Sequence, residues 1–181
     1  MKKIIILLYF LLCSTNVVAN ETVKKLNKLF NDLLISNNKT SFEIEQKIWK
    51  LWSTHPKDNE LTFLLAKGSD AVNNNQFIKA IDIFTNVINL DPNWAEAWNK
   101  RATVLYMIGE YEKSQNDINK VLELENRHFG ALAGQGLVNI KLKNYEKAIK
   151  SYEKALEIYP SMRSPEIMIK EIEALIKQDL I

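Results

Sequence analysis

The sequence predicts an all-α protein, a solenoid built from three repeated helix pairs. Two observations lead to this prediction. The chain has only five glycines and four prolines among 181 residues, which disfavours a β-protein with many tight turns. Its small, aromatic and proline residues also recur at one fixed spacing without a gap. One helix pair cannot bury its apolar face alone, whereas stacked pairs can.

The repeat is visible when equivalent residues are aligned. Each of the following residues lies 34 positions from the next in its set: Leu64, Trp98 and Leu132; Gly68, Ala102 and Gly136; Phe77, Tyr111 and Tyr145; Ala80, Ser114 and Ala148; Phe84, Ile118 and Tyr152; Pro92, Asn126 and Pro160. We expect the small residues to let two helices approach and the aromatic rings to fill the space around them. The prolines are expected to end the second helix of a pair.

The stretch ALAGQGLVNIKLKNYEKAIKSYEKALEIYP resembles the tetratricopeptide repeat (TPR) family, whose pattern is W-x2-L-G-x2-Y, then an alanine, an aromatic residue and a proline. FLLAKGSDAVNNNQFIKAIDIFTNVINLDP resembles it as well. The resemblance implies a right-handed α-solenoid over 59–162, with repeats 61–94, 95–128 and 129–162. The chain departs from the family pattern at two positions of the first helix. Where the pattern has leucine, the three repeats have Lys67, Arg101 and Gln135. Where it has tyrosine, they have Ala71, Leu105 and Asn139.

The segments on either side do not fit the repeat. Residues 20–58 predict an N-terminal helix pair, whose second helix is expected to begin at the Thr40 capping box and to stop before Pro56. Residues 163–181 predict a C-terminal capping helix with Ser164 as its N-cap. A solenoid needs such a helix to cover its last apolar face.

Residues 1–19 predict a secretory signal peptide. Lys2 and Lys3 precede a continuous apolar run over 4–12, and small residues stand where a signal peptidase would cut after Ala19. We therefore expect a periplasmic or secreted protein.

Two alternatives to cleavage remain open. Cys13 is a candidate for lipid attachment, although Leu12 is larger than the residue that usually precedes a lipid-modified cysteine. The second alternative is an uncleaved anchor, for which the apolar run is short. Membrane contact is expected only if the signal is retained or lipidated.

Cleavage would also change the charge and the chemistry of the chain. The net charge of +2 would become zero, with 22 basic and 22 acidic residues, so no basic excess remains for nucleic acid. Removal of Cys13 leaves no thiol nucleophile and no disulfide.

No catalytic or metal-binding motif is apparent. His55 and His128 lack ligand spacing and are interpreted as structural. Gly130, Gly134 and Gly136 lack the preceding strand of a dinucleotide site and are interpreted as sites of close helix packing. We expect no enzymatic activity, no metal and no small-molecule cofactor.

The resemblance implies that the first helix of each repeat lines a concave groove that binds a protein or peptide. Positions spaced by three and four share one helix face. Those that correspond to the groove are Leu65, Ser69 and Val72; Glu96, Asn99, Thr103 and Tyr106; and Leu137 and Ile140, with Thr62, Gly130 and Ala133 on the same faces. Tyr106 is the expected aromatic anchor. Arg101, in the same predicted helix, is expected to pair with an acidic residue within the scaffold.

These features predict an exported, non-catalytic adaptor that holds a protein or peptide partner in its groove. The alternative is a structural subunit of an envelope complex that acts by self-association. Some family members clamp an acidic C-terminal peptide with lysine, arginine and asparagine side chains. The corresponding positions here are Leu65, Ser69, Lys100, Gly130 and Gly134. Only Lys100 is a cation, so we expect no useful affinity for peptides that end in Glu-Glu-Val-Asp.

Overall fold

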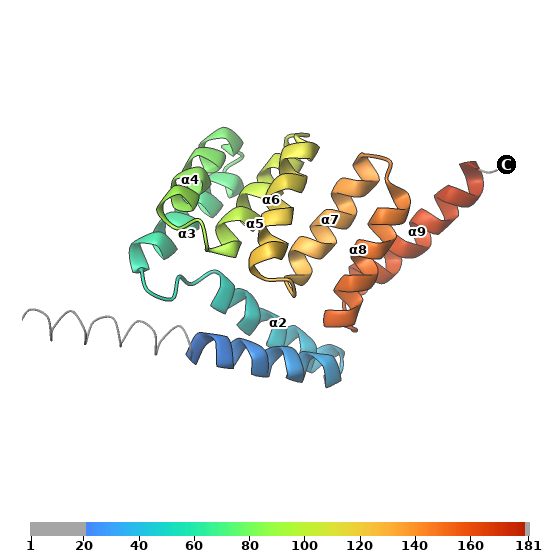
Figure 1. The fold of residues 1–181 in the computed structure, drawn as a ribbon, viewed down its shortest axis with the longest axis horizontal. Helices are drawn as coiled ribbons and strands as arrows, with labels where there is room; N and C mark the ends of the chain where they lie inside the picture. Colours follow the sequence, from blue (N-terminus) through green and yellow to red (C-terminus); the bar gives the residue numbers. More distant parts are fainter. Residues whose placement is uncertain (1–20, 180–181) are drawn as a thin grey trace, which may run out of the picture. The chain divides into compact units, whose positions relative to one another are not determined.

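The computed structural model describes residues 21–179, in which every regular element is a helix (Figure 1). The signal peptide expected over 1–19, with its cleavage after Ala19, lies outside the described residues. None of the described helices is both long enough and apolar enough to cross a membrane.

The chain divides into two compact units between Thr62 and Phe63. The first unit contains a helix over residues 21–35 and a second helix, α2 (Asn38–Trp52). The helices that follow are α3 (Asn59–Asn73), α4 (Phe77–Leu90), α5 (Ala95–Met107), α6 (Tyr111–Leu124), α7 (Phe129–Lys141), α8 (Tyr145–Ile158) and α9 (Arg163–Asp179).

The first unit is a helical hairpin with its own small apolar core. Both helices bury apolar side chains, namely Leu26, Phe30, Leu33, Ile44, Ile48 and Trp52. The rings of Phe30 and Trp52 lie 6.0 Å apart between centroids. Val23, near the start of the first helix, does not join this core and is 54% exposed.

The predicted start of α2 at the Thr40 capping box is wrong. The helix begins at Asn38, because Asn37 is the N-cap and its side chain accepts a hydrogen bond from the backbone nitrogen of Thr40 at 3.2 Å. Asparagine and threonine are both favourable N-caps, and the earlier of the two starts the helix here. The helix ends at Trp52, before Pro56 as predicted.

The second unit is an α-helical repeat solenoid, which confirms the predicted fold class. Helix α5 packs on α6 and α7 packs on α8, each forming one helix pair. Consecutive pairs meet where α4 packs on α5 and α6 packs on α7, and α9 packs on α8 (Figure 1). Each helix thus contacts mainly its neighbours along the chain, as expected for stacked repeats.

The turn inside each helix pair has the same backbone geometry three times. Asn75, Gly109 and Lys143 adopt positive φ angles of 57°, 83° and 59°, and all three occupy the same position of their repeat. In each turn, the amide that follows this residue donates back to a carbonyl five positions earlier, as Glu110 does to Leu105 at 2.9 Å. This left-handed closure satisfies carbonyls at the end of the first helix.

In two of the helix pairs, a glycine of the first helix lies directly against an aromatic ring of the second. Gly68 of α3 faces the ring of Phe84 in α4, and Gly136 of α7 faces the ring of Tyr152 in α8. A Cβ atom built on either glycine would overlap the aromatic ring. In the second repeat, the equivalent position is Ala102, which packs in the same buried cluster as Ile118. The expected pairing of small and large residues is therefore what joins each helix pair.

Helix α9 begins two residues earlier than predicted, at Arg163 and not at Pro165. Ser164 is not the N-cap, because Arg163 is already helical. Pro165 still lies in the first turn, where a missing backbone N–H costs no helical hydrogen bond. Ile172 of α9 is buried against Ala148 and Tyr152 of α8, whereas Leu175 is 44% exposed.

We expect Gly136→Ala to lower the free energy of unfolding by about 1–3 kcal/mol, because the added methyl group overlaps the Tyr152 ring. Gly134→Ala is the matched control on the same helix. A Cβ there would lie 3.7 Å from Ile118, an ordinary contact. That variant should gain up to about 1 kcal/mol from higher helix propensity. Urea denaturation measures the free energy of unfolding of both variants. An equal change in the two would contradict the packing argument.

We expect Tyr152→Phe to equal or exceed the wild type in stability at neutral pH. The Tyr152 hydroxyl is buried and has no hydrogen-bond partner among the described residues, so its removal relieves a desolvation cost. Burial raises the pKa of Tyr152 well above its usual range. The unfolded chain therefore loses this proton first, and wild-type stability should fall as the pH rises above about 10. Thermal melts of both proteins between pH 8 and pH 11 should show that the Tm of Tyr152→Phe exceeds that of the wild type by an amount that grows with pH. A constant difference in Tm would contradict this assignment.

Candidate binding groove

A pocket lies between α5 and α7, where the second repeat meets the third. Its volume is about 210 Å³. It is lined by Asn99, Ala102, Thr103, Tyr106, Ser114, Ile118, Gly130, Ala131, Ala133, Gly134 and Leu137. Most of the groove positions expected in these two repeats are thus brought together around one cavity. We refer to it below as the α5/α7 pocket.

Helix α5 contributes the polar and aromatic side of this pocket. Asn99, Thr103 and Tyr106 follow one another at steps of four and three, which places them on one face of the helix. The Thr103 hydroxyl donates to the backbone carbonyl of Asn99 at 2.9 Å. The half-buried Tyr106 ring is held against Tyr111, with 5.6 Å between their centroids. An aromatic ring held in this way is suited to contact an apolar ligand group.

Helix α7 contributes a side with little side-chain bulk. Gly130, Ala133 and Gly134 line the pocket together with Leu137, which is 37% exposed. The sequence interpretation of these glycines as packing sites is correct for Gly136, which faces the Tyr152 ring, and wrong for Gly134, where an added Cβ would make only an ordinary contact. Both Gly130 and Gly134 line the pocket.

The remaining predicted groove positions lie elsewhere. Leu65 is buried at 2% exposure, Ser69 donates its hydroxyl to the Leu65 carbonyl at 3.1 Å, and Val72 is half-buried. None of these α3 residues lines the α5/α7 pocket. Ile140 packs against the apolar cluster between α8 and α9. The pocket is therefore a feature of the second and third repeats.

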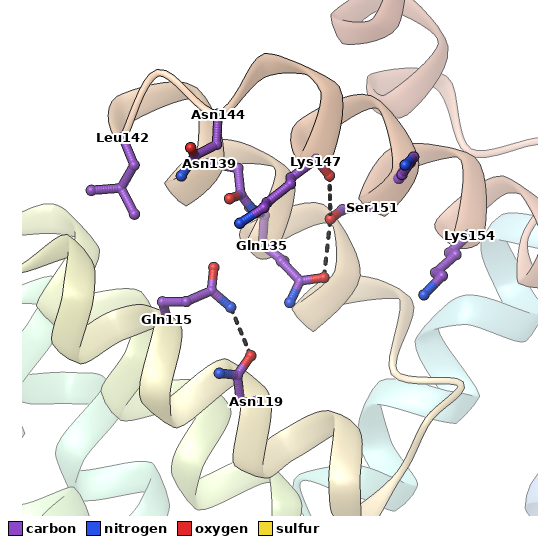
Figure 2. Close-up of a pocket in the computed structure, with 10 residues that line it drawn as sticks. Gln115, Asn119, Gln135, Asn139, Leu142, Asn144, Lys147, Ser151 and Lys154 are labelled. Carbon is purple, nitrogen blue, oxygen red and sulfur yellow. Dashed lines mark hydrogen bonds between the residues drawn. The ribbon is translucent and has the colours of Figure 1, made fainter.

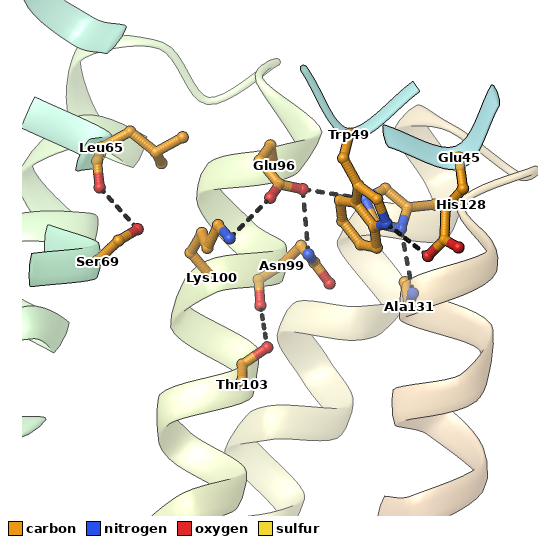
Figure 3. A network of polar contacts seen from close by, with 10 residues as sticks. All are labelled: Glu45, Trp49, Leu65, Ser69, Glu96, Asn99, Lys100, Thr103, His128 and Ala131. Carbon is orange, nitrogen blue, oxygen red and sulfur yellow. Dashed lines mark hydrogen bonds and ion pairs between the residues drawn. The ribbon is translucent and has the colours of Figure 1, made fainter. Parts of the chain in front are cut away.

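Glu96 differs from the other predicted groove residues because its carboxylate is buried and already has partners (Figure 3). Its Oε2 lies 3.1 Å from His128 Nε2 and accepts from Asn99 Nδ2, also at 3.1 Å. The Lys100 ammonium lies 3.3 Å from Oε1. Buried charges need this kind of compensation. The network joins α5 to the start of α7 and occupies both Glu96 and Lys100.

The orientation of His128 follows from its second contact. Its Nδ1 accepts a hydrogen bond from the backbone nitrogen of Ala131 at 3.1 Å, so His128 is the N-cap of α7. An accepting Nδ1 leaves the ring proton on Nε2, which donates to Glu96. The structural interpretation of this histidine is confirmed. No sequence pattern indicated its pairing with Glu96, which lies in the preceding repeat.

The two other side chains singled out from the sequence also have structural roles. Arg101 donates to both carboxylate oxygens of Asp117 at 2.7 and 2.8 Å, which confirms the predicted ion pair. It also lies 5.0 Å from the ring centroid of Trp98. His55 accepts from the Lys57 amide at 3.3 Å. Within residues 21–179, no group of three or more histidines, cysteines and carboxylates is arranged to hold a metal ion.

Sequence comparisons assign the repeats of the second unit. Residues 95–128 and 130–162 each match a family model described as tetratricopeptide repeat. A TPR repeat-containing protein of Rhizobium etli is 36% identical over 106 residues, which cover 59% of this chain and 52% of that protein. A tetratricopeptide repeat protein 36 homolog of Nematostella vectensis is 32% identical over 69 residues, or 38% of each chain. The chain thus spans about half or less of these curated relatives.

Solved structures share the fold at lower sequence identity. The first TPR of Spaghetti (RPAP3), bound to an HSP90 peptide, has a TM-score of 0.64 and 22% identity, covering 66% of this chain and 94% of that one. The Sgt2 TPR domain of Aspergillus fumigatus has a TM-score of 0.64 and 21% identity, covering 67% and 82%. The two matched segments, together with the repeated helix pairs, show that the second unit of this chain contains tetratricopeptide repeats.

Proposed function

We propose that this TPR protein is a non-catalytic adaptor that binds a protein or peptide partner in the α5/α7 pocket. The observation that carries the proposal is the pocket itself, which combines an aromatic ring, an apolar wall and a hydrogen-bonding amide. Asn99 uses its amide nitrogen on Glu96, which leaves Oδ1 as an acceptor for a ligand. Such a combination fits one apolar side chain of a peptide and a donor from its backbone.

Similar TPR structures support a peptide as the class of ligand. The Spaghetti domain is bound to the HSP90 peptide SRMEEVD, and another TPR domain of RPAP3 to the HSP70 peptide SGPTIEEVD. The positions that correspond to an acidic-peptide clamp are different in this chain. Gly130 and Gly134 provide no charge, and Lys100 is already next to Glu96. We therefore propose a partner recognised by apolar contacts and not by a terminal carboxylate.

We expect Leu137→Glu to weaken binding of peptides selected from a random display library at least tenfold, about 1.4 kcal/mol, because it places a charge at the apolar end of the pocket. Met107→Glu is the control, since Met107 is 50% exposed on α5 and does not line the pocket. Fluorescence anisotropy with labelled peptides measures both. Selected peptides should be apolar; micromolar binding of peptides ending in Glu-Glu-Val-Asp that Lys100→Ala abolishes would refute this specificity.

We further propose that the protein is exported and processed, on the basis of the charged, apolar and small-residue regions that precede Asn20. Mass spectrometry of the protein recovered from cells should find Asn20 at the amino terminus. Ala19→Arg should block this cleavage, because the peptidase requires a small residue there. A chain that still begins at Met1, or that carries a lipid on Cys13, would disprove cleavage after Ala19.

A further inference from the structure

Two pockets occupy equivalent positions in the second and third repeats, on helix surfaces other than those of the α5/α7 pocket. The first has a volume of about 480 Å³ and lies among α4, α5 and α6. The second has a volume of about 410 Å³ and lies among α6, α7 and α8 (Figure 2). Several of their lining positions are equivalent, one repeat apart. The same backbone therefore provides two pockets whose side chains can be compared directly.

The charges of the first pocket are paired. Arg101 contacts Asp117 at 2.7 Å, and Lys113 contacts Glu110 at 3.0 Å. In the second pocket, Arg101 and Asp117 are replaced by Gln135 and Ser151, which share one hydrogen bond of 3.0 Å. Asn144 stands in place of Glu110 and Lys147 in place of Lys113. The lysine is retained while its acid is lost.

Two further lysines increase this imbalance. Lys150 and Lys154 follow Lys147 at steps of three and four, so all three lie on one side of α8 and line the pocket. The described lining contains no acidic residue. None of the three ammonium groups forms an ion pair within residues 21–179. The second pocket therefore has an uncompensated positive rim.

The interior of the second pocket is polar where the first is apolar. Ile81 and Leu105 of the first pocket correspond to Gln115 and Asn139. Gln115 donates to Asn119 at 2.8 Å, but its Oε1 is buried and has no partner among the described residues. Figure 2 shows this oxygen turned away from Asn119, on the side of the Gln115 amide that faces Asn139. A buried acceptor without a partner destabilises the folded chain, and rotation of the Gln115 amide toward a ligand hydroxyl would relieve this cost.

We propose that the pocket lined by Gln115, Gln135, Asn139, Asn144, Lys147 and Ser151 binds an anionic sugar, a monosaccharide that carries a carboxylate or a phosphate. The lysines bind the anionic group, because ammonium groups form charge-assisted hydrogen bonds with such oxygens. The side-chain amides both donate and accept, which matches the ring hydroxyls of a sugar. Rotation of the Gln115 side chain lets its Oε1, which is buried in the unliganded chain, accept from one of these hydroxyls. This site is separate from the proposed peptide groove.

The test is a titration of the full protein, followed by NMR of the side-chain amides of glutamine and asparagine. The probes are glucuronate and glucose 6-phosphate, with glucose and inorganic phosphate as controls. At least one charged sugar should bind with a Kd of about 1 mM or tighter, and at least tenfold tighter than either control. The stronger of the two identifies the preferred anionic group. The amide of Asn116, in the first pocket, should not shift.

Asn144→Glu is the decisive variant, since it places an acid beside Lys147 as Glu110 stands beside Lys113. The same geometry is already stable one repeat earlier, so the fold should be kept while affinity falls at least tenfold. Lys150→Ala, at an exposed position, should weaken binding at least threefold without affecting the fold. The proposal is overturned if neither sugar binds at ~10 mM, if inorganic phosphate binds equally well, or if Asn144→Glu leaves the affinity unchanged.

Discussion

The repeats depend on one constraint. The two helices of a pair pack together at a glycine or alanine, where there is little or no side chain between them. At Gly68 and Gly136, the facing aromatic ring occupies the volume that a Cβ would need. This contact fixes the separation of the helices, and the separation determines which residues of the first helix remain accessible. The α5/α7 pocket lies between two such pairs, in which α5 packs on α6 and α7 packs on both α6 and α8.

The sequence was sufficient to predict the repeated fold because its period combines several independent signals at each step. Trp98, Ala102 and Tyr111 each fall in a slot whose neighbours repeat the same chemistry. Helix starts were predicted less well, since Asn37 and Thr40 are both acceptable caps and only the folded chain distinguishes them. Helix periodicity placed Asn99, Thr103 and Tyr106 on one face, and the structure places them around one pocket.

Contacts between repeats were not predictable in the same way. The pairing of Glu96 with His128 depends on how one repeat stacks on the next, and neither residue belongs to the repeating pattern. The role of Gly134 was misjudged for a related reason. A glycine within a helix indicates either close packing or an open cavity, and the facing side chain decides between them. Gly136 faces a ring, whereas the nearest side chain to Gly134 is Ile118 at an ordinary distance.

The neighbour-to-neighbour packing of the second unit has a consequence for its dynamics. Because α9 packs mainly on α8, it can separate from the remaining helices without disturbing those that precede α8. Opening of a repeat array proceeds from its end inward, so amide protons of α9 should exchange with solvent sooner than those of α5 and α6. The α5/α7 pocket then belongs to the slowly exchanging interior. Its walls are preorganised, and a partner that docks there has little local ordering to complete.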